Sequence, residues 1–213
     1  MRFIELKHET EFETYRHAIA NHIDVLLPID YLKQGQVYGY FNKRGEICGG
    51  FAMITQAPFR VLDSIPNFKG LTIDPKLSKT AEITGVWLSS KDKKQFSSLR
   101  FWVNIILKIL MSRKKYFVYA YSSRKDGLGK IYARANPEVL FRGETIIMPG
   151  MPSADHESVE VVFRSRIIIQ ALKNPDFFIK RLKSKNKNKP KDLYEKTENT
   201  ILPIVSPILE LWP

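Results

Sequence analysis

The chain has 213 residues, of which 44% are hydrophobic and 26% charged, and its formal net charge is +12 at pH 7. These proportions are typical of a globular protein and exclude a disordered chain outside the tail. Cys48 is the only cysteine, which excludes an intrachain disulfide and is typical of a reducing compartment. The N-terminus lacks the apolar core of a signal peptide, and the apolar run 101–111 is too short to span a membrane, so we expect a cytoplasmic protein.

The first part of the chain predicts a helix followed by a β-hairpin. Residues 9–23 carry apolar side chains at helical spacing. Two aromatic and β-branched runs, 37–42 and 47–55, are separated by four residues that form a turn signal. The proline-containing segment 56–80 predicts an irregular connection with a short strand at 59–62.

The second part predicts alternating strands and helices. Residues 81–88 form an apolar run with a carboxylate near its start, and we expect a strand there. The helix predicted over 98–111 is apolar nearly all round, which is typical of a helix buried against a sheet. The remaining predictions are strand 116–122, helix 128–136, strands 138–148 and 159–164, and helix 167–183. The fold class is α+β, with a mixed, mostly antiparallel sheet flanked by helices on both faces.

The C-terminal part differs in composition from the rest. We expect a domain over 1–166, a C-terminal helix over 167–183 and an exposed basic linker over 184–200, which is rich in Lys, Asn and Pro. The tail 201–213 carries many large apolar side chains, so we expect it to dock on the domain.

The order of elements between Ala81 and Ile147 is strand, basic loop, long apolar helix, strand, short helix with a central tyrosine, and strand. This order resembles the core of the GNAT acyltransferases, which move an acyl group from a phosphopantetheine thioester to an amine. The resemblance implies a GNAT-like domain with a C-terminal extension.

The resemblance also implies two catalytic residues. A carboxylate on the fourth strand of the family often acts as the base, and a tyrosine on the helix after the fifth strand often acts as the acid. These positions fall on Glu82 and Tyr132. Burial at the head of an apolar strand raises the pKa of a carboxyl group toward neutrality, as a base requires. We expect both side chains to face one cleft beside the 84–88 edge, on one side of the sheet. The alternatives are a Glu82 that points to solvent or pairs with Arg100 or Arg142, and a Tyr132 that only fills the core.

The donor site is expected next to the same strand. The resemblance implies that the pantetheine arm pairs with the backbone of Val86, Trp87 and Leu88. The family binds phosphates with Gln/Arg-x-x-Gly-x-Gly/Ala at the start of the following helix. The chain has no glycine there, and the implied donor-binding residues are Lys94, Gln95, Ser97, Ser98 and Arg100.

A second candidate for the phosphate loop occurs at 124–129, which matches the family pattern. The missing glycine at 94–100 favours a donor with a single phosphate, the phosphopantetheine arm of an acidic acyl carrier protein, beside the basic residues at 91–94. Acyl-coenzyme A is the other donor considered, and a degenerate site that binds no donor is the alternative to both. We expect no permanently bound cofactor.

The large apolar side chains predict a pocket for a fatty acyl group that ends near the 101–111 helix. The residues considered for it are Phe51, Met53, Phe59, Trp87, Phe117, Phe141, Met148 and Met151. This feature resembles the family branch that makes long-chain N-acyl amines or amino acids, including autoinducer-synthase-like enzymes. The acceptors considered are an amino acid, a polyamine and a peptide side chain.

A different class of function is a non-catalytic basic module in which 183–191 and 91–100 contact nucleic acid or an anionic membrane. The charge run has no interleaved aromatic residues and no named nucleic-acid motif, which argues against nucleic acid. His17 and His22 are five residues apart, which does not place them on one helical face as metal ligands.

Overall fold

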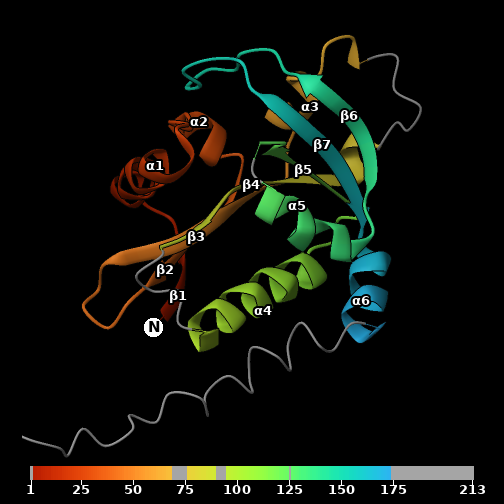
Figure 1. Ribbon diagram of the computed structural model, residues 1–213. Coiled ribbons are helices and arrows are strands. Elements are labelled where there is room, and N and C mark those ends of the chain that lie inside the picture. The colour runs from red at the N-terminus through yellow and green to blue at the C-terminus, as the bar shows by residue number, and fades with distance from the viewer. Residues whose placement is uncertain (1, 69–75, 90–94, 125, 174–213) are drawn as a thin grey trace, which may run out of the picture.

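A computed structural model of the chain describes residues 2–68, 76–89, 95–124 and 126–173 (Figure 1). The basic linker and apolar tail predicted for 184–213, and the predicted helical residues 174–183, lie outside this part of the chain. Within these described ranges, none of the helices has the length and apolar character needed to cross a membrane.

A seven-stranded sheet forms the centre of the molecule, with the strand order β1-β2-β3-β4-β5-β7-β6. Only the β4/β5 pair is parallel among the described pairs, and the other neighbours are antiparallel. The expected mixed, mostly antiparallel sheet is therefore confirmed. The strands are β1 (Arg2–Leu6), β2 (Gly35–Phe41), β3 (Ile47–Ile54), β4 (Thr80–Leu88), β5 (Tyr116–Ser122), β6 (Glu138–Glu144) and β7 (His156–Phe163).

Helices cover both faces of the sheet, as Figure 1 shows. One face packs against α1 (Glu9–Ile23), α2 (Ile29–Leu32) and α3 (Arg60–Asp63). The other packs against α4 (Gln95–Met111), α5 (Asp126–Tyr132) and α6 (Arg164–Lys173). Two apolar layers result, and they are called here the α1 face and the α4 face.

Several boundaries differ from the sequence predictions. Residues 59–62 were expected to be a strand, but helix α3 occupies 60–63 because its backbone bonds to Phe59 and to the sheet override the strand preference of Val61. Strand β1 and helix α2 were missed, since five and four residues give too short a pattern. Helix α6 begins at Arg164 rather than 167, and β6 ends at Glu144 rather than 148.

The parallel pair β4/β5 separates after three residue pairs. Thr80, Ala81 and Glu82 pair with Tyr116, Phe117 and Val118, whereas β4 continues to Leu88 and β5 to Ser122 without further pairing between them. A gap therefore opens between two neighbouring strands of the sheet, and one edge of β4 beyond Glu82 faces it.

A β-bulge in β4 lies beside this gap. Trp87 pairs with Gly50 and Thr84 with Ala52, so two residues of β4 oppose one residue of β3. Gly85 takes a φ of +65°, and a Cβ there would lie 2.5 Å from the Tyr15 hydroxyl. The Tyr15 hydroxyl donates to the Gly85 carbonyl at 2.9 Å. The bulge therefore needs glycine, and α1 holds it from one face.

Candidate active site

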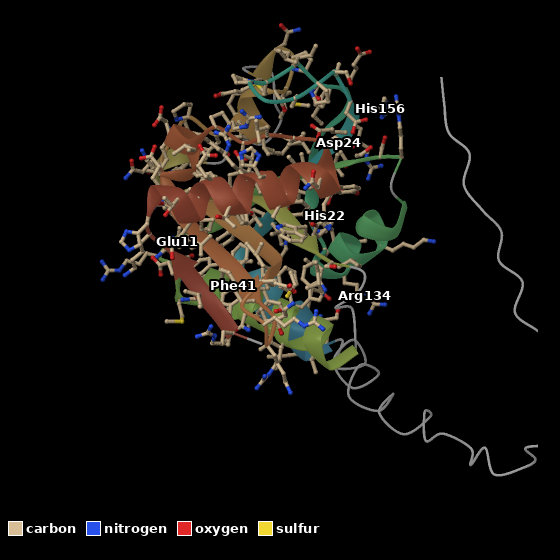
Figure 2. The ribbon with its side chains drawn as sticks, turned by 90° about the vertical axis from the view of Figure 1, so that its left-hand side faces the viewer. Glu11, His22, Asp24, Phe41, Arg134 and His156 are labelled. Atoms are coloured by element: carbon tan, nitrogen blue, oxygen red, sulfur yellow. The ribbon has the colours of Figure 1, made fainter. Side chains whose placement is uncertain are left out.

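A cavity of about 420 Å³ occupies the gap between β4 and β5. Its wall comes from segments far apart in the chain: the end of α1, helix α3, β4, β5 and the connection before β7. Asp24, just beyond the C-terminal end of α1 (Figure 2), belongs to this wall. The strand separation thus creates a site that passes from one face of the sheet to the other.

Glu82 lies in this wall at the last position of β4 that pairs with β5. Its partner in register, Val118, and its backbone donor, Val61, both belong to the α1 face, so the carboxylate points to that face. The side chain is only 1% exposed. Its Oε2 accepts a hydrogen bond from the Val61 N–H at 3.0 Å, while Oε1 has no hydrogen-bond partner among the described residues. Glu82 therefore neither points to solvent nor pairs with Arg100 or Arg142.

Burial raises the pKa of Glu82 to about 7. The Tyr31 hydroxyl, the Val61 N–H and the charge of Arg60 each oppose part of this rise. The Tyr31 hydroxyl faces the carboxylate but does not reach the geometry of a well-formed hydrogen bond. A carboxyl group with this pKa exchanges its proton near neutral pH, which is the property required of a general base.

Arg60 gives the cavity a positive charge next to this carboxylate. Its Nη1 donates to the Pro149 carbonyl at 2.6 Å, and its guanidinium lies 5.4 Å from the centroid of the Tyr31 ring. Glu157 also lines the cavity, and burial raises the pKa of its carboxyl group. The site therefore combines the buried Glu82 with partly buried groups of both signs. Arg60 and Glu157 were missed from the sequence, because only the tertiary fold brings them to Glu82.

Tyr132, the last residue of α5, lines the same cavity from the other face. Its ring lies 4.7 Å from the ring of Tyr119 and 5.4 Å from that of Tyr121, and it packs with the α4-face layer. Burial raises the pKa of its hydroxyl, so the group stays protonated at neutral pH. The expectation that Glu82 and Tyr132 lie on one side of the sheet is wrong. They share a cavity because the cavity passes through the gap.

A second cavity, of about 150 Å³, adjoins the first on the α4 face. Both cavities are lined by Ile83, Val86 and Tyr132, so these side chains form the junction between them. The rest of the second cavity is mainly aliphatic and aromatic, with lining residues that include Trp102, Ile105, Ile106, Ile109, Phe117, Tyr119, Ile131 and Val162. An apolar cavity therefore begins where the more polar cavity ends.

Most of the large apolar residues that the sequence analysis considered for an acyl pocket do not line either cavity. Phe117 lines the second cavity, and Met148 and Met151 line the first. The other residues belong to the packed core and line neither cavity: Phe51, Met53, Phe59, Trp87 and Phe141. The α4 residues that do line the second cavity were signalled in the sequence by a helix that is apolar nearly all round.

The donor residues expected on β4 divide into two groups. Val86 lines both cavities, whereas the Trp87 side chain packs on the α1 face with its ring 4.3 Å from His22. The bulge at Gly85 explains this, because one extra residue reverses the alternation of the strand. Leu88 packs with the α4-face layer. The expected role is pairing by the backbone of Val86, Trp87 and Leu88, and it stays a prediction because these side-chain directions do not bear on it.

The expected phosphate-binding residues are at the start of α4. Ser98 is half-buried there and Arg100 is exposed. Lys94 and the side chains of Gln95 and Ser97 lie outside the described part of the chain. In the second candidate loop, 124–129, Arg124 lines the first cavity and lies 3.9 Å from Asp155. Within the described ranges, no group of three or more His, Cys, Asp or Glu side chains is arranged to hold a metal ion.

No protein-family model and no curated protein sequence matches the chain. Solved structures do match it, at low identity. FeeM, an N-acyl amino acid synthase from uncultured soil microbes, has a TM-score of 0.58 and 13% identity, covering 82% of this chain and 97% of that one. A spermidine N-acetyltransferase SpeG chimera from Vibrio cholerae and hSSAT has a TM-score of 0.53 and 6% identity, covering 79% and 99%. An acetyltransferase of the GNAT family from Staphylococcus aureus Mu50 has a TM-score of 0.50 and 11% identity, covering 76% and 98%.

Structural likeness at identities of 13% or less is evidence for a shared fold and not for a shared substrate. The strand order, the gap between β4 and β5, and these likenesses agree with one another. The chain has the fold of the GNAT acyltransferases, as its order of elements predicts.

Proposed function

We propose that the protein is an N-acyltransferase that moves an acyl group from a phosphopantetheine thioester to an amine. The observation that carries this proposal is the larger cavity, which passes through the sheet. A buried carboxylate whose pKa burial raises to about 7 lines it from the α1 face, and a protonated tyrosine lines it from the α4 face, where it adjoins the apolar pocket, on the fold of known acyltransferases.

The arrangement of the two groups suggests a direction for the reaction. Glu82 points to the α1 face, so the amine approaches from that side, and the thioester lies in the gap. The amine nitrogen attacks the carbonyl carbon, the C–N bond forms and the C–S bond breaks. Glu82 takes the proton that leaves the nitrogen. Tyr132, on the α4 face, gives its proton to the departing sulfur and regains one from solvent.

The size of the apolar cavity suggests the length of the acyl group. Its volume of about 150 Å³ equals that of a protein cavity known to hold benzene, which has six carbons. We therefore propose a medium-length acyl chain of roughly six carbons. A much longer chain requires the cavity to extend beyond its present end.

The charged residues that line the larger cavity favour one class of acceptor. Glu82, Glu157, Asp24 and Asp155 supply negative charge, and Arg60 and Arg124 supply positive charge. This mixture favours an acceptor with both an amine and a carboxylate, such as an amino acid, over a polyamine. The third acceptor class, a peptide side chain, also brings backbone carbonyls that arginine can bind.

The donor is proposed to be either acyl carrier protein or acyl-coenzyme A. The sequence around the start of α4 has no glycine, which favours the single phosphate of a carrier-bound arm. An acidic carrier also suits the net charge of +12.

Thiol release with purified protein tests the proposal. Acetyl, hexanoyl and hexadecanoyl thioesters of coenzyme A and of acyl carrier protein are each paired with amino acids, spermidine and a lysine peptide. Transfer is expected to be fastest with hexanoyl donors and lost in Glu82→Gln. If no pair reacts while the protein binds nucleic acid or anionic vesicles, the basic binding module is the better account.

A further inference from the structure

We propose that Glu160 of β7 is a positioning residue for Tyr132. It holds the two tyrosine rings against which the Tyr132 ring packs, and so fixes the Tyr132 hydroxyl at the junction of the cavities. The inference rests on the proposed function, in which Tyr132 supplies a proton.

Glu160 lies inside the α4 face and is only 3% exposed. It stands directly across from Tyr119 in the β5/β7 register. Its Oε2 accepts a hydrogen bond from the Tyr119 hydroxyl at 3.0 Å, and its Oε1 accepts from the Tyr121 hydroxyl at 2.8 Å and from the Ser158 hydroxyl at 3.0 Å. The Arg142 Nη2 lies 4.0 Å from its Oε1. One carboxylate thus fixes two tyrosines of β5 by their hydroxyl ends.

The Tyr132 ring packs against the rings of these two tyrosines. Their ring centroids lie 4.7 and 5.4 Å from that of Tyr132. Helix α5 approaches Tyr121 closely, because a Cβ at Gly129 would lie 3.2 Å from that ring. Within the described part of the chain, the Tyr132 hydroxyl has no hydrogen bond that fixes it. Its position therefore depends on ring packing, and the packing depends on Glu160.

A purely structural role explains this cluster poorly. A buried carboxylate is expensive to desolvate, and well-packed apolar residues usually stabilise such a position as well or better. Phe117 and Val162 belong to the same α4-face layer, and on its other side Glu160 lines a cavity together with Lys130, Arg142 and Ser158. Its geometry gives rigidity to the rings that face the proposed reacting centre, which apolar packing alone does not provide.

A double-mutant cycle on acyl transfer tests the inference, using Glu160→Gln, Tyr132→Phe and the double variant. Glu160→Gln keeps the size of the side chain but replaces one acceptor oxygen with a donor. We expect it to lower kcat by roughly 10- to 100-fold, since small displacements of a reacting group cost about that much. KM for the acceptor should change little. In the Tyr132→Phe background, the same substitution should have no further effect on kcat. An equal loss in both backgrounds overturns the inference.

Further variants keep the test decisive. If Glu160→Gln does not fold, Tyr119→Phe removes one hydrogen bond and keeps the ring, and its smaller loss of kcat should also vanish in the Tyr132→Phe background. Leu6→Ala, at the far edge of the sheet, should lower the melting temperature without changing kcat. If Tyr132→Phe retains full kcat while the wild type transfers acyl groups, the inference and the proton-donor role of Tyr132 both fall, and the proposed acyl transfer itself stands. If the wild type transfers none, the inference and the proposed function both fall.

Discussion

The substitution Glu82→Gln should make the protein less active and more stable at once. In the folded protein the pKa of Glu82 is raised from 4.5 to about 7 by burial. The unfolded chain therefore releases this proton at lower pH than the folded protein does. Between those two pH values the folded state binds more protons, so its stability falls as pH rises and then levels off. A glutamine side chain does not titrate in this range, so the Glu82→Gln variant does not undergo this loss of stability.

The size of the effect follows from the shift. A rise from 4.5 to about 7 corresponds to about 3 kcal/mol, at roughly 1.4 kcal/mol per pH unit. Glutamine can still accept the hydrogen bond from Val61 N–H, so that contact is kept. Above pH 8 the variant should therefore be more stable by about 3 kcal/mol, or roughly 6 to 12 °C in Tm for a chain of this size. Near pH 4 the two proteins should be nearly equal.

Urea unfolding of both proteins between pH 4 and 9 measures this difference directly, and acyl transfer is followed over the same range. Wild-type kcat/KM should rise with an apparent pKa of about 7, and the variant should lack this rise. Glu144→Gln, at an exposed position of β6, is the matched control and should show no pH-dependent difference. A stability difference that stays constant with pH, or one that grows toward acid, refutes the reasoning.

Three further substitutions test other parts of the site. Tyr132→Phe should lower kcat by roughly 100- to 10,000-fold in assays of thiol release, with the circular dichroism spectrum unchanged. Ile106→Phe, in the wall of the apolar cavity, should reduce hexanoyl transfer at least tenfold and spare acetyl transfer, whereas Leu107→Phe on the exposed side of α4 should do neither. Gly85→Ala should destabilise the protein by about 2 to 4 kcal/mol in urea unfolding, because its Cβ meets Tyr15 and Ile19. Gly45 also has a positive φ but a Cβ there meets nothing within 4 Å, so Gly45→Ala should cost only the strain of left-handed backbone, about 1 to 2 kcal/mol, and a cost as large as that of Gly85→Ala would contradict the account.

The sequence was informative where a pattern is local. The apolar run 81–88 predicted the strand that carries Glu82, and the apolar residues after the basic loop predicted helix α4. The helix predicted over 128–136 is present as α5, although α5 ends at Tyr132 and a short 3-10 helix follows over Ala133–Ala135. Each of these depends on residues within about one element, where periodicity and turn signals are strong.

The parts that failed depend on register and on distant segments. The bulge at Gly85 shifts the alternation of β4 by one residue, so Trp87 turns to α1 while the sequence pattern alone sends it toward the donor. Arg60 reaches Glu82 only after α3 packs on the sheet. The opposite faces of Glu82 and Tyr132 follow from a gap in strand pairing, which leaves no signal in composition or spacing.

The gap between β4 and β5 also divides the sheet into two halves that are joined by few backbone pairs. Strands β1 to β4 form one half and β5, β7 and β6 the other, and the backbone pairing that joins the halves comprises the three pairs from Thr80 to Glu82. The seam with the fewest interstrand bonds thus coincides with the place where a substrate arm would lie. A molecule bound there bridges both halves, and its binding free energy adds to the cohesion of the whole sheet. A bound substrate would therefore make the sheet harder to unfold, because it adds contacts where only a short run of backbone pairs joins the two halves.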